Sequence, residues 1–156
     1  MKRLLLLLSL VVVALFVLDS CTKSNDPEPM PVVGAWKLDR IRTSGFTGGF
    51  ASFNGDNDPA IFDYQDSFNV KADKTFTGTI RTSGRVIDYK GNWEFTNNEL
   101  SLKDEKGNED KYTLDNTATP AQLLSKAVAQ RDSLRNPTTG RVELVNYSLR
   151  LVYTKQ

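Results

Sequence analysis

Residues 85–96 read RVIDYKGNWEFT, and apolar and polar side chains alternate along this stretch. Every second residue from Ile87 to Phe95 is apolar, aromatic or glycine, and those from Asp88 to Glu94 between them are polar or charged. Successive side chains of a β-strand point to opposite faces, so the stretch predicts a strand with one buried face. Asn97 and Asn98 follow, and asparagine accepts the positive φ angles of a tight hairpin turn. The alternation then resumes, which predicts an antiparallel hairpin.

Similar alternation surrounds this hairpin. It predicts further strands over residues 33–43, 61–71, 75–81, 100–103, 110–114 and 141–154. Strands with one apolar face must bury that face, and closing the sheet removes its exposed edges. We therefore expect an all-β fold, an antiparallel up-and-down β-barrel of about eight strands. A two-sheet sandwich fits the same pattern.

One segment departs from the strand pattern. Thr119-Pro120-Ala121-Gln122 has the spacing of a helix capping box. Leu124, Ala127 and Val128 then recur at helical spacing, and Asn136-Pro137 would end a helix. We expect one amphipathic helix of about 16 residues near the C-terminal end, packed on the sheet or over a barrel end.

Composition excludes several function classes. The 156 residues include no His and one Cys, which excludes disulfides within the chain, Cys/His zinc sites and histidine-dependent catalysis. Basic and acidic residues number 20 and 19 with no basic stretch, which argues against nucleic acid as a partner. Asn54, Asp56 and Asp58 have the spacing of a calcium loop, but Pro59 stands where that loop needs glycine. We expect no enzyme activity, metal or cofactor.

The N-terminus has the design of a secretory leader. Lys2 and Arg3 precede residues 4–18, which are apolar except for Ser9. A helix of that length spans about 22 Å, short of the ~30 Å hydrocarbon core of a bilayer. Residues 1–20 are therefore predicted to be a signal peptide, and the three prolines within residues 21–32 predict an extended tether. Residues 33–156 would form one domain.

The leader ends in Leu18-Asp19-Ser20-Cys21, which resembles a bacterial lipobox. The resemblance implies that Cys21 is lipidated and becomes the mature N-terminus; the alternative is an ordinary thiol. Three acyl chains would anchor the protein stably in a membrane. Thr22 at the next position implies the outer membrane and leaves the leaflet open.

Three motifs of the mature chain resemble those of bacterial lipocalin-like, or calycin-type, domains. They are Gly34-Ala35-Trp36, the strand-turn-strand FNVKADKTFTG at residues 68–78, and GNWEFTNNELSL at residues 91–102. The resemblance covers the whole globular part. It implies that Trp36, two residues after Gly34, plugs the closed barrel end, with Arg150 as the candidate cation across its face. The alternation places Arg150 on the face opposite Leu149 and Leu151, so this contact needs a β-bulge, and the alternative is a solvent-facing Arg150. Asp73-Lys74 replaces the family's Asp-Gly, so positive φ at Lys74 is not expected.

The resemblance also suggests where a ligand would bind. A barrel of eight strands either fills with side chains or holds one small ligand. The candidate orienting groups in an apolar cup are the hydroxyls of Tyr64, Tyr89 and Tyr147. The first long loop, residues 43–59, carries four glycines and three phenylalanines: Phe46, Phe50 and Phe53. These rings would cover the mouth, contact a partner, contact lipid or fold back on the domain.

Two hypotheses from different classes follow. In the first, a lipid-anchored envelope protein binds a small apolar ligand or a protein partner at the barrel mouth. In the second, a structural or assembly lipoprotein has a barrel filled by side chains and acts through its outer surface. The state of the lumen distinguishes the two.

Overall fold

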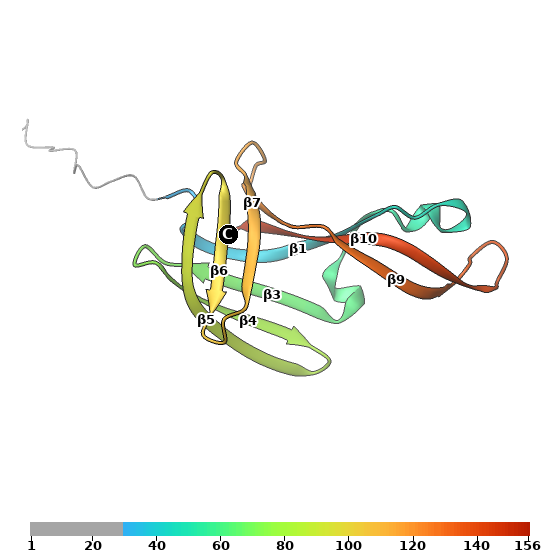
Figure 1. Cartoon of the computed structure of the whole chain (residues 1–156), viewed down its shortest axis with the longest axis horizontal. Helices are drawn as coiled ribbons and strands as arrows, with labels where there is room; N and C mark the ends of the chain where they lie inside the picture. Colours follow the sequence, from blue (N-terminus) through green and yellow to red (C-terminus); the bar gives the residue numbers. More distant parts are fainter. Residues whose placement is uncertain (1–29) are drawn as a thin grey trace, which may run out of the picture.

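The computed structural model describes residues 30–156, which form ten strands and two short 3-10 helices (Figure 1). Cys21, the predicted signal peptide and most of the predicted tether lie outside the described residues. In chain order the elements are β1 (Gly34–Ser44), η1 (Gly48–Phe53), β2 (Gly55–Asn57), η2 (Pro59–Phe62), β3 (Tyr64–Val70), β4 (Thr75–Thr82), β5 (Arg85–Thr96), β6 (Glu99–Asp104), β7 (Glu109–Asp115), β8 (Gln122–Ser125), β9 (Val128–Arg135) and β10 (Val142–Lys155).

Eight of these strands close into an antiparallel barrel. The order is β1-β3-β4-β5-β6-β7-β8-β10, and pairing of β10 with β1 closes the ring. Consecutive strands of the chain are mostly neighbours, so the barrel is an up-and-down meander. Closure satisfies the backbone hydrogen bonds of both end strands, because no edge remains. The predicted all-β barrel is therefore confirmed, and the sandwich is excluded.

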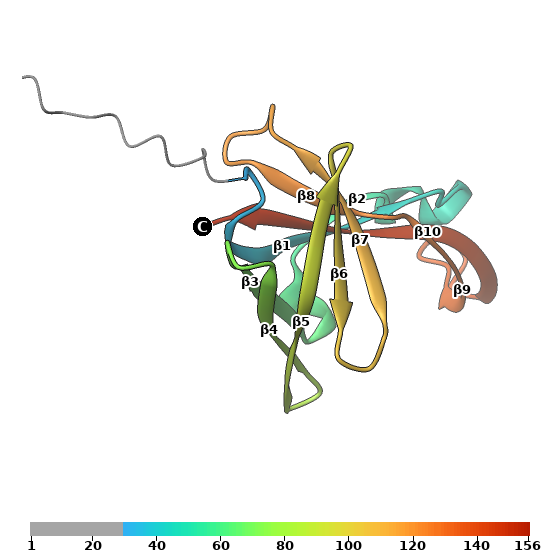
Figure 2. The same ribbon diagram turned by 60° about the vertical axis from the view of Figure 1, so that its left-hand side comes forward.

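The first and last strands are longer than the barrel and project from it as an extension. β2 pairs with the distal part of β1, and β9 pairs with β10 over eight residues, so the extension has the order β2-β1-β10-β9. Figures 1 and 2 show it reaching to one side of the barrel, with η1 and the β9–β10 turn at its far end. The extension leaves from the barrel end where β3 begins.

The opposite end of the barrel is closed by packed side chains. Trp36 and Trp93 are 1% and 2% exposed, and their indole N–H groups donate to the carbonyls of Val32 and Lys71, each at 2.8 Å. Val32, at the predicted boundary between tether and domain, is itself fully buried. All residues of the continuous core lie between Val32 and Tyr153, so this part of the chain has the core it needs to fold without the leader.

The predicted helix is wrong, because residues 122–125 and 128–135 form β8 and β9. β8 fills the place between β7 and β10 that barrel closure requires, and its Leu123 is fully buried. A helix of this length without a buried face is marginal in water, whereas pairing with β10 supplies a full hydrogen-bond ladder. The non-local ladder therefore overrides the local helical pattern.

Two turns show how local sequence sets the hairpins. Asn97 and Asn98 have φ values of 52° and 66°, as the predicted tight turn requires. Lys74 also has positive φ, at 68°, contrary to expectation. Asp73 imposes that turn, because its carboxylate accepts hydrogen bonds from both the backbone N–H and the hydroxyl of Thr75.

Gly91, the first residue of the motif at residues 91–102, allows β5 to approach β6 closely. A Cβ atom placed there would lie 2.0 Å from the carbonyl oxygen of Lys103 on β6. β5 is therefore able to approach β6 only with glycine at this position.

Candidate functional site

A cleft of about 950 Å³ borders the start of β3, the β4–β5 hairpin, the β6–β7 turn and β10, and its lining reaches Trp36 at the closed end of the barrel. Part of this space lies over the outer sheet face beside Ser67 and Thr77, so the lumen itself is smaller. Its inner wall is mainly aromatic and aliphatic, with Tyr64, Phe68, Ile80, Tyr89, Tyr112 and Leu151.

A buried carboxylate lies at the base of the cleft. Asp66 on β3 is 6% exposed, and its two oxygens accept hydrogen bonds from the hydroxyls of Tyr89 at 2.8 Å and Tyr153 at 2.6 Å. Burial raises the pKa of Asp66, and the two hydrogen bonds from tyrosine act in the opposite direction. Burial and the nearby carboxylate also raise the pKa of Tyr89 and of Tyr153 well above the usual value.

Glycine allows this arrangement on the neighbouring strand. A Cβ at Gly78 would lie 2.3 Å from the Tyr89 ring and 2.6 Å from its hydroxyl oxygen. The Tyr89 side chain therefore lies flat over β4 and reaches Asp66 across the barrel wall.

Further polar side chains line the cleft between Asp66 and its rim. Tyr64 is half-buried, and burial together with Asp66 and Asp110 raises its pKa to about 12. Asp110 on β7 is exposed at the rim, where partial burial and the neighbouring Asp104 raise its pKa. Tyr112 is 6% exposed and lines the same cleft. The site thus combines carboxylates with phenol rings.

Comparison with known proteins gives the family. The lipocalin-like domain family matches residues 32–123, which is more than half of the chain and runs from the first buried residue into β8. The chain belongs to the lipocalin-like domain family. No curated protein and no solved structure matches it.

In this lipocalin-like protein the three loop phenylalanines fold back on the extension. Phe46 and Phe50 are 7% and 4% exposed, and the Phe46 ring stacks on Tyr147 with centroids 4.4 Å apart. Phe53 is 40% exposed and meets Phe46 edge-on at 5.7 Å. Among the described residues, none of these phenylalanines nor Tyr147 lines the cleft. Of the six ligand-binding candidates, only Tyr64 and Tyr89 do.

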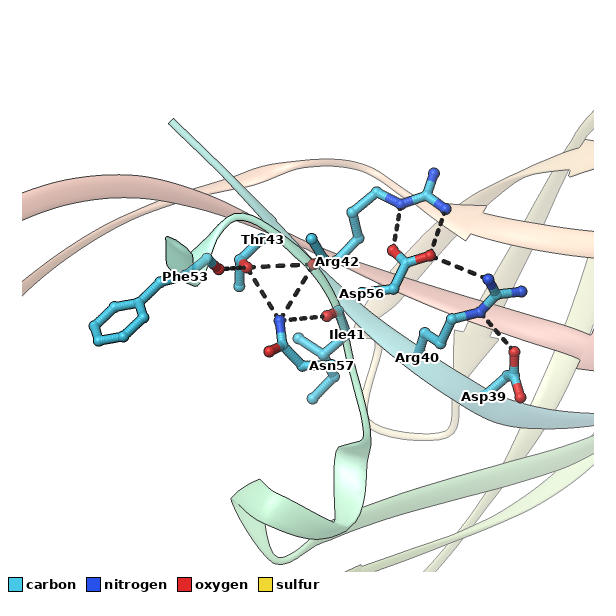
Figure 3. A network of polar contacts seen from close by, with 9 residues as sticks. Asp39, Arg40, Ile41, Arg42, Thr43, Phe53, Asp56 and Asn57 are labelled. Atoms are coloured by element: carbon cyan, nitrogen blue, oxygen red, sulfur yellow. Dashed lines mark hydrogen bonds and ion pairs between the residues drawn. The ribbon is translucent and has the colours of Figure 1, made fainter. Parts of the chain in front are cut away.

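Polar contacts hold the loop in place (Figure 3). The Thr43 hydroxyl donates to the carbonyl of Phe53, and the Asn57 amide donates to the carbonyl of Ile41 at 3.2 Å. On the outer face Arg42 binds both oxygens of Asp56, at 2.6 and 3.1 Å. Asp56 thus serves an ion pair that fixes β2 against β1.

The plug at the closed end has a different cation from the predicted one. Arg150 lies opposite Arg42 on the outer face, whereas Lys155 lies opposite Trp36 with its ammonium 5.7 Å from the ring centroid. A register shift between Leu38 and Arg40 turns the distal half of β1 over, so Arg40 does not share the inner face of Trp36. Arg150 therefore has no role in the plug, and Lys155 takes its place.

Sequence reasoning missed Asp66 as a site residue. Asp66 shares the even-numbered positions of β3 with Tyr64 and Phe68, so the alternation alone places its carboxylate on the inner face. A charged residue on an apolar strand face was the available signal. The strand predicted over residues 61–71 would place Phe62 on that face too, but Phe62 lies in η2 and is 48% exposed.

Proposed function

We propose that this protein is a non-catalytic binding protein that takes a small, largely apolar ligand into the barrel mouth. The observation that supports this most directly is the asymmetry of the barrel, which is closed by Trp36 and Trp93 at one end and open over the aromatic cleft at the other. Ligand pockets typically have volumes of about 300–1,000 Å³ and apolar walls with a few polar groups. The inner wall of the cleft is of this kind, with Asp66 and the tyrosine hydroxyls as its polar groups.

We further propose that Cys21 carries lipid and anchors the protein in the outer membrane of a cell envelope. Residue 30 enters the domain at the closed end, where Gln156 also ends, with its backbone N–H bonded to the Ala35 carbonyl (Figure 1). With an extended tether, the mouth would point away from the anchoring membrane and receive its ligand from the aqueous side. Within residues 30–156 the structure contains no helix suited to crossing a membrane.

Ligand binding is tested by titrating residues 22–156 with N-phenyl-1-naphthylamine, an uncharged apolar fluorophore. Leu151 and Arg150 are neighbours on β10 that face the cleft and the outside. Leu151→Trp narrows the lumen and should weaken binding by about tenfold or more, whereas Arg150→Trp should leave the affinity unchanged. The absence of saturable binding, or equal effects of the two substitutions, would contradict the proposal.

Anchoring is tested separately in the bacterial envelope. Cys21→Ser should move the full-length protein from the membrane fraction to the soluble fraction. Persistence in the membrane fraction would rule out the lipid as the anchor.

A second function, contact with an envelope protein, is favoured by the extension. Val142 and Leu144 on the outer face of β10 are 65% and 55% exposed, and β9 is the edge of the sheet. If this surface binds an envelope protein, replacing Val142 and Leu144 with serine should weaken that contact in the cell, while the affinity of the barrel for the fluorescent probe stays unchanged.

A further inference from the structure

Charge is segregated across the wall of this protein. On the outer face Arg42 and Arg150 lie directly opposite each other on β1 and β10, and Arg131 on β9 shares that face. The inner face carries carboxylates instead: Asp66 and Asp110 in the barrel, and Asp132 on the extension, where it accepts a hydrogen bond from Tyr147. A net charge near zero therefore does not reveal that the inner face is acidic, while the outer face carries both signs, with Asp56 and Glu94 among its carboxylates.

The inner face offers no compensating cation. Strand alternation and register place every Lys and Arg of the barrel strands within residues 34–155 on the outer face or at a strand end. Three lysines border the cleft: Lys37 and Lys90 point outward from β1 and β5, and Lys106 lies on the exposed β6–β7 turn. A ligand carboxylate beside Asp66 on the inner face would therefore meet like charge at low dielectric.

The same wall suits a cation. Ammonium groups bind to the faces of aromatic rings, and the cleft presents the phenol rings of Tyr64 and Tyr112 between Asp66 and Asp110. An ionised carboxylate has about four acceptor positions, and on Asp66 two tyrosine hydroxyls and the backbone N–H of Ser67 use three of them. Tyr64 is half-buried in the wall of the cleft, where its hydroxyl can meet a ligand, whereas the Tyr112 hydroxyl lies within hydrogen-bonding reach of Tyr153.

We propose that the ligand of this lumen is an organic cation, an amine or quaternary ammonium head on an apolar body. This inference rests on the proposed ligand-binding function and specifies its ligand class. The head lies between Asp66 and Asp110 against the tyrosine rings, and the apolar body lies along Leu151 toward the mouth.

Three ten-carbon probes that differ only in their head group test the idea: decylamine, decanol and decanoate, titrated calorimetrically into residues 22–156 at neutral pH and low salt. We expect decylammonium to bind about tenfold more tightly than decanol, and decanoate to bind more weakly than decanol. Asp110→Asn, at the exposed rim where folding is not at risk, should reduce the preference for the amine over the alcohol about threefold or more. Asp66→Asn should reduce it further.

The control is Glu94→Gln, which removes an exposed carboxylate from the outer face of β5 and should leave the preference unchanged. If decanol binds but decylammonium binds no more tightly than decanoate, the cation proposal is overturned while the binding function stands. An equal loss of preference in Glu94→Gln would overturn it too, because general surface charge would then explain the result. If none of the three probes binds, the proposed function itself fails.

Discussion

The hydrogen bond from Tyr89 to Asp66 gives the sharpest test of how the site is held. Tyr89→Phe removes one hydroxyl and leaves the ring over Gly78. A hydrogen bond to a charged group contributes about 1.5–3 kcal/mol to stability, and the remaining carboxylate oxygen keeps its bond from Tyr153. We therefore expect Tyr89→Phe to lower the free energy of unfolding by about 2 kcal/mol at neutral pH.

Tyr147→Phe is the matched control. Tyr147 also donates to an aspartate, Asp132 at 2.6 Å, but this pair is exposed on the extension. Water replaces an exposed bond at little cost, so its loss should lower the free energy of unfolding by less than about 0.5 kcal/mol. Urea unfolding followed by tryptophan fluorescence measures both, because Trp36 and Trp93 are buried and become exposed on unfolding. Equal costs for the two substitutions would refute the reasoning.

The pH dependence gives an independent check. Burial raises the pKa of Asp66 in the folded state, so folding takes up a proton and wild-type stability falls as pH rises from the unfolded pKa through the folded one. Below this window the acid is neutral and its bond from Tyr89 contributes only about 1 kcal/mol. The difference between wild type and Tyr89→Phe should therefore shrink on acidification. A difference that stays constant would show that Asp66 carries no charge at neutral pH, and one that grows would contradict the reasoning.

Three further outcomes are expected. Gly91→Ala should lower the free energy of unfolding by at least ~3 kcal/mol in urea titrations, because the new methyl group would clash with a backbone carbonyl, which cannot rotate away as a side chain can. A loss of less than ~1 kcal/mol would contradict this. Phe46→Ala should cost about 2–3 kcal/mol yet leave probe affinity unchanged, since its ring packs on Tyr147 and not in the cleft; weakened binding by a folded variant would restore the loop as part of the site. Burial raises the pKa of Tyr64 to about 12, so folding stability should fall as pH rises from about 10 to 12. Phenolate absorbance and circular dichroism should then change together. Ionisation of Tyr64 near pH 10 in a folded barrel would refute its burial.

Much of the barrel could be predicted from local sequence, because a strand with one buried face shows a period of two whatever its partner is. β5 was predicted with its full bounds, and the Asn97-Asn98 turn with its positive φ angles. Inward placement of Tyr64 and Tyr89 follows from the same alternation. Even Asp66 was within reach, since its position in β3 places the carboxylate inside.

Other features depend on contacts between distant segments and have no local signature. β8 and β9 form strands because closure of the barrel and the ladder of β10 supply partners, against a helical pattern in their own sequence. The pairing register of β1 with β10 brings Lys155 to Trp36. Sequence alone thus determined the strands and their inner faces, through side-chain periodicity and turn chemistry. Only the tertiary structure decided which strands meet and in what register, and so which tyrosines surround Asp66, because pairing energy depends on residues as far apart as 66 and 153.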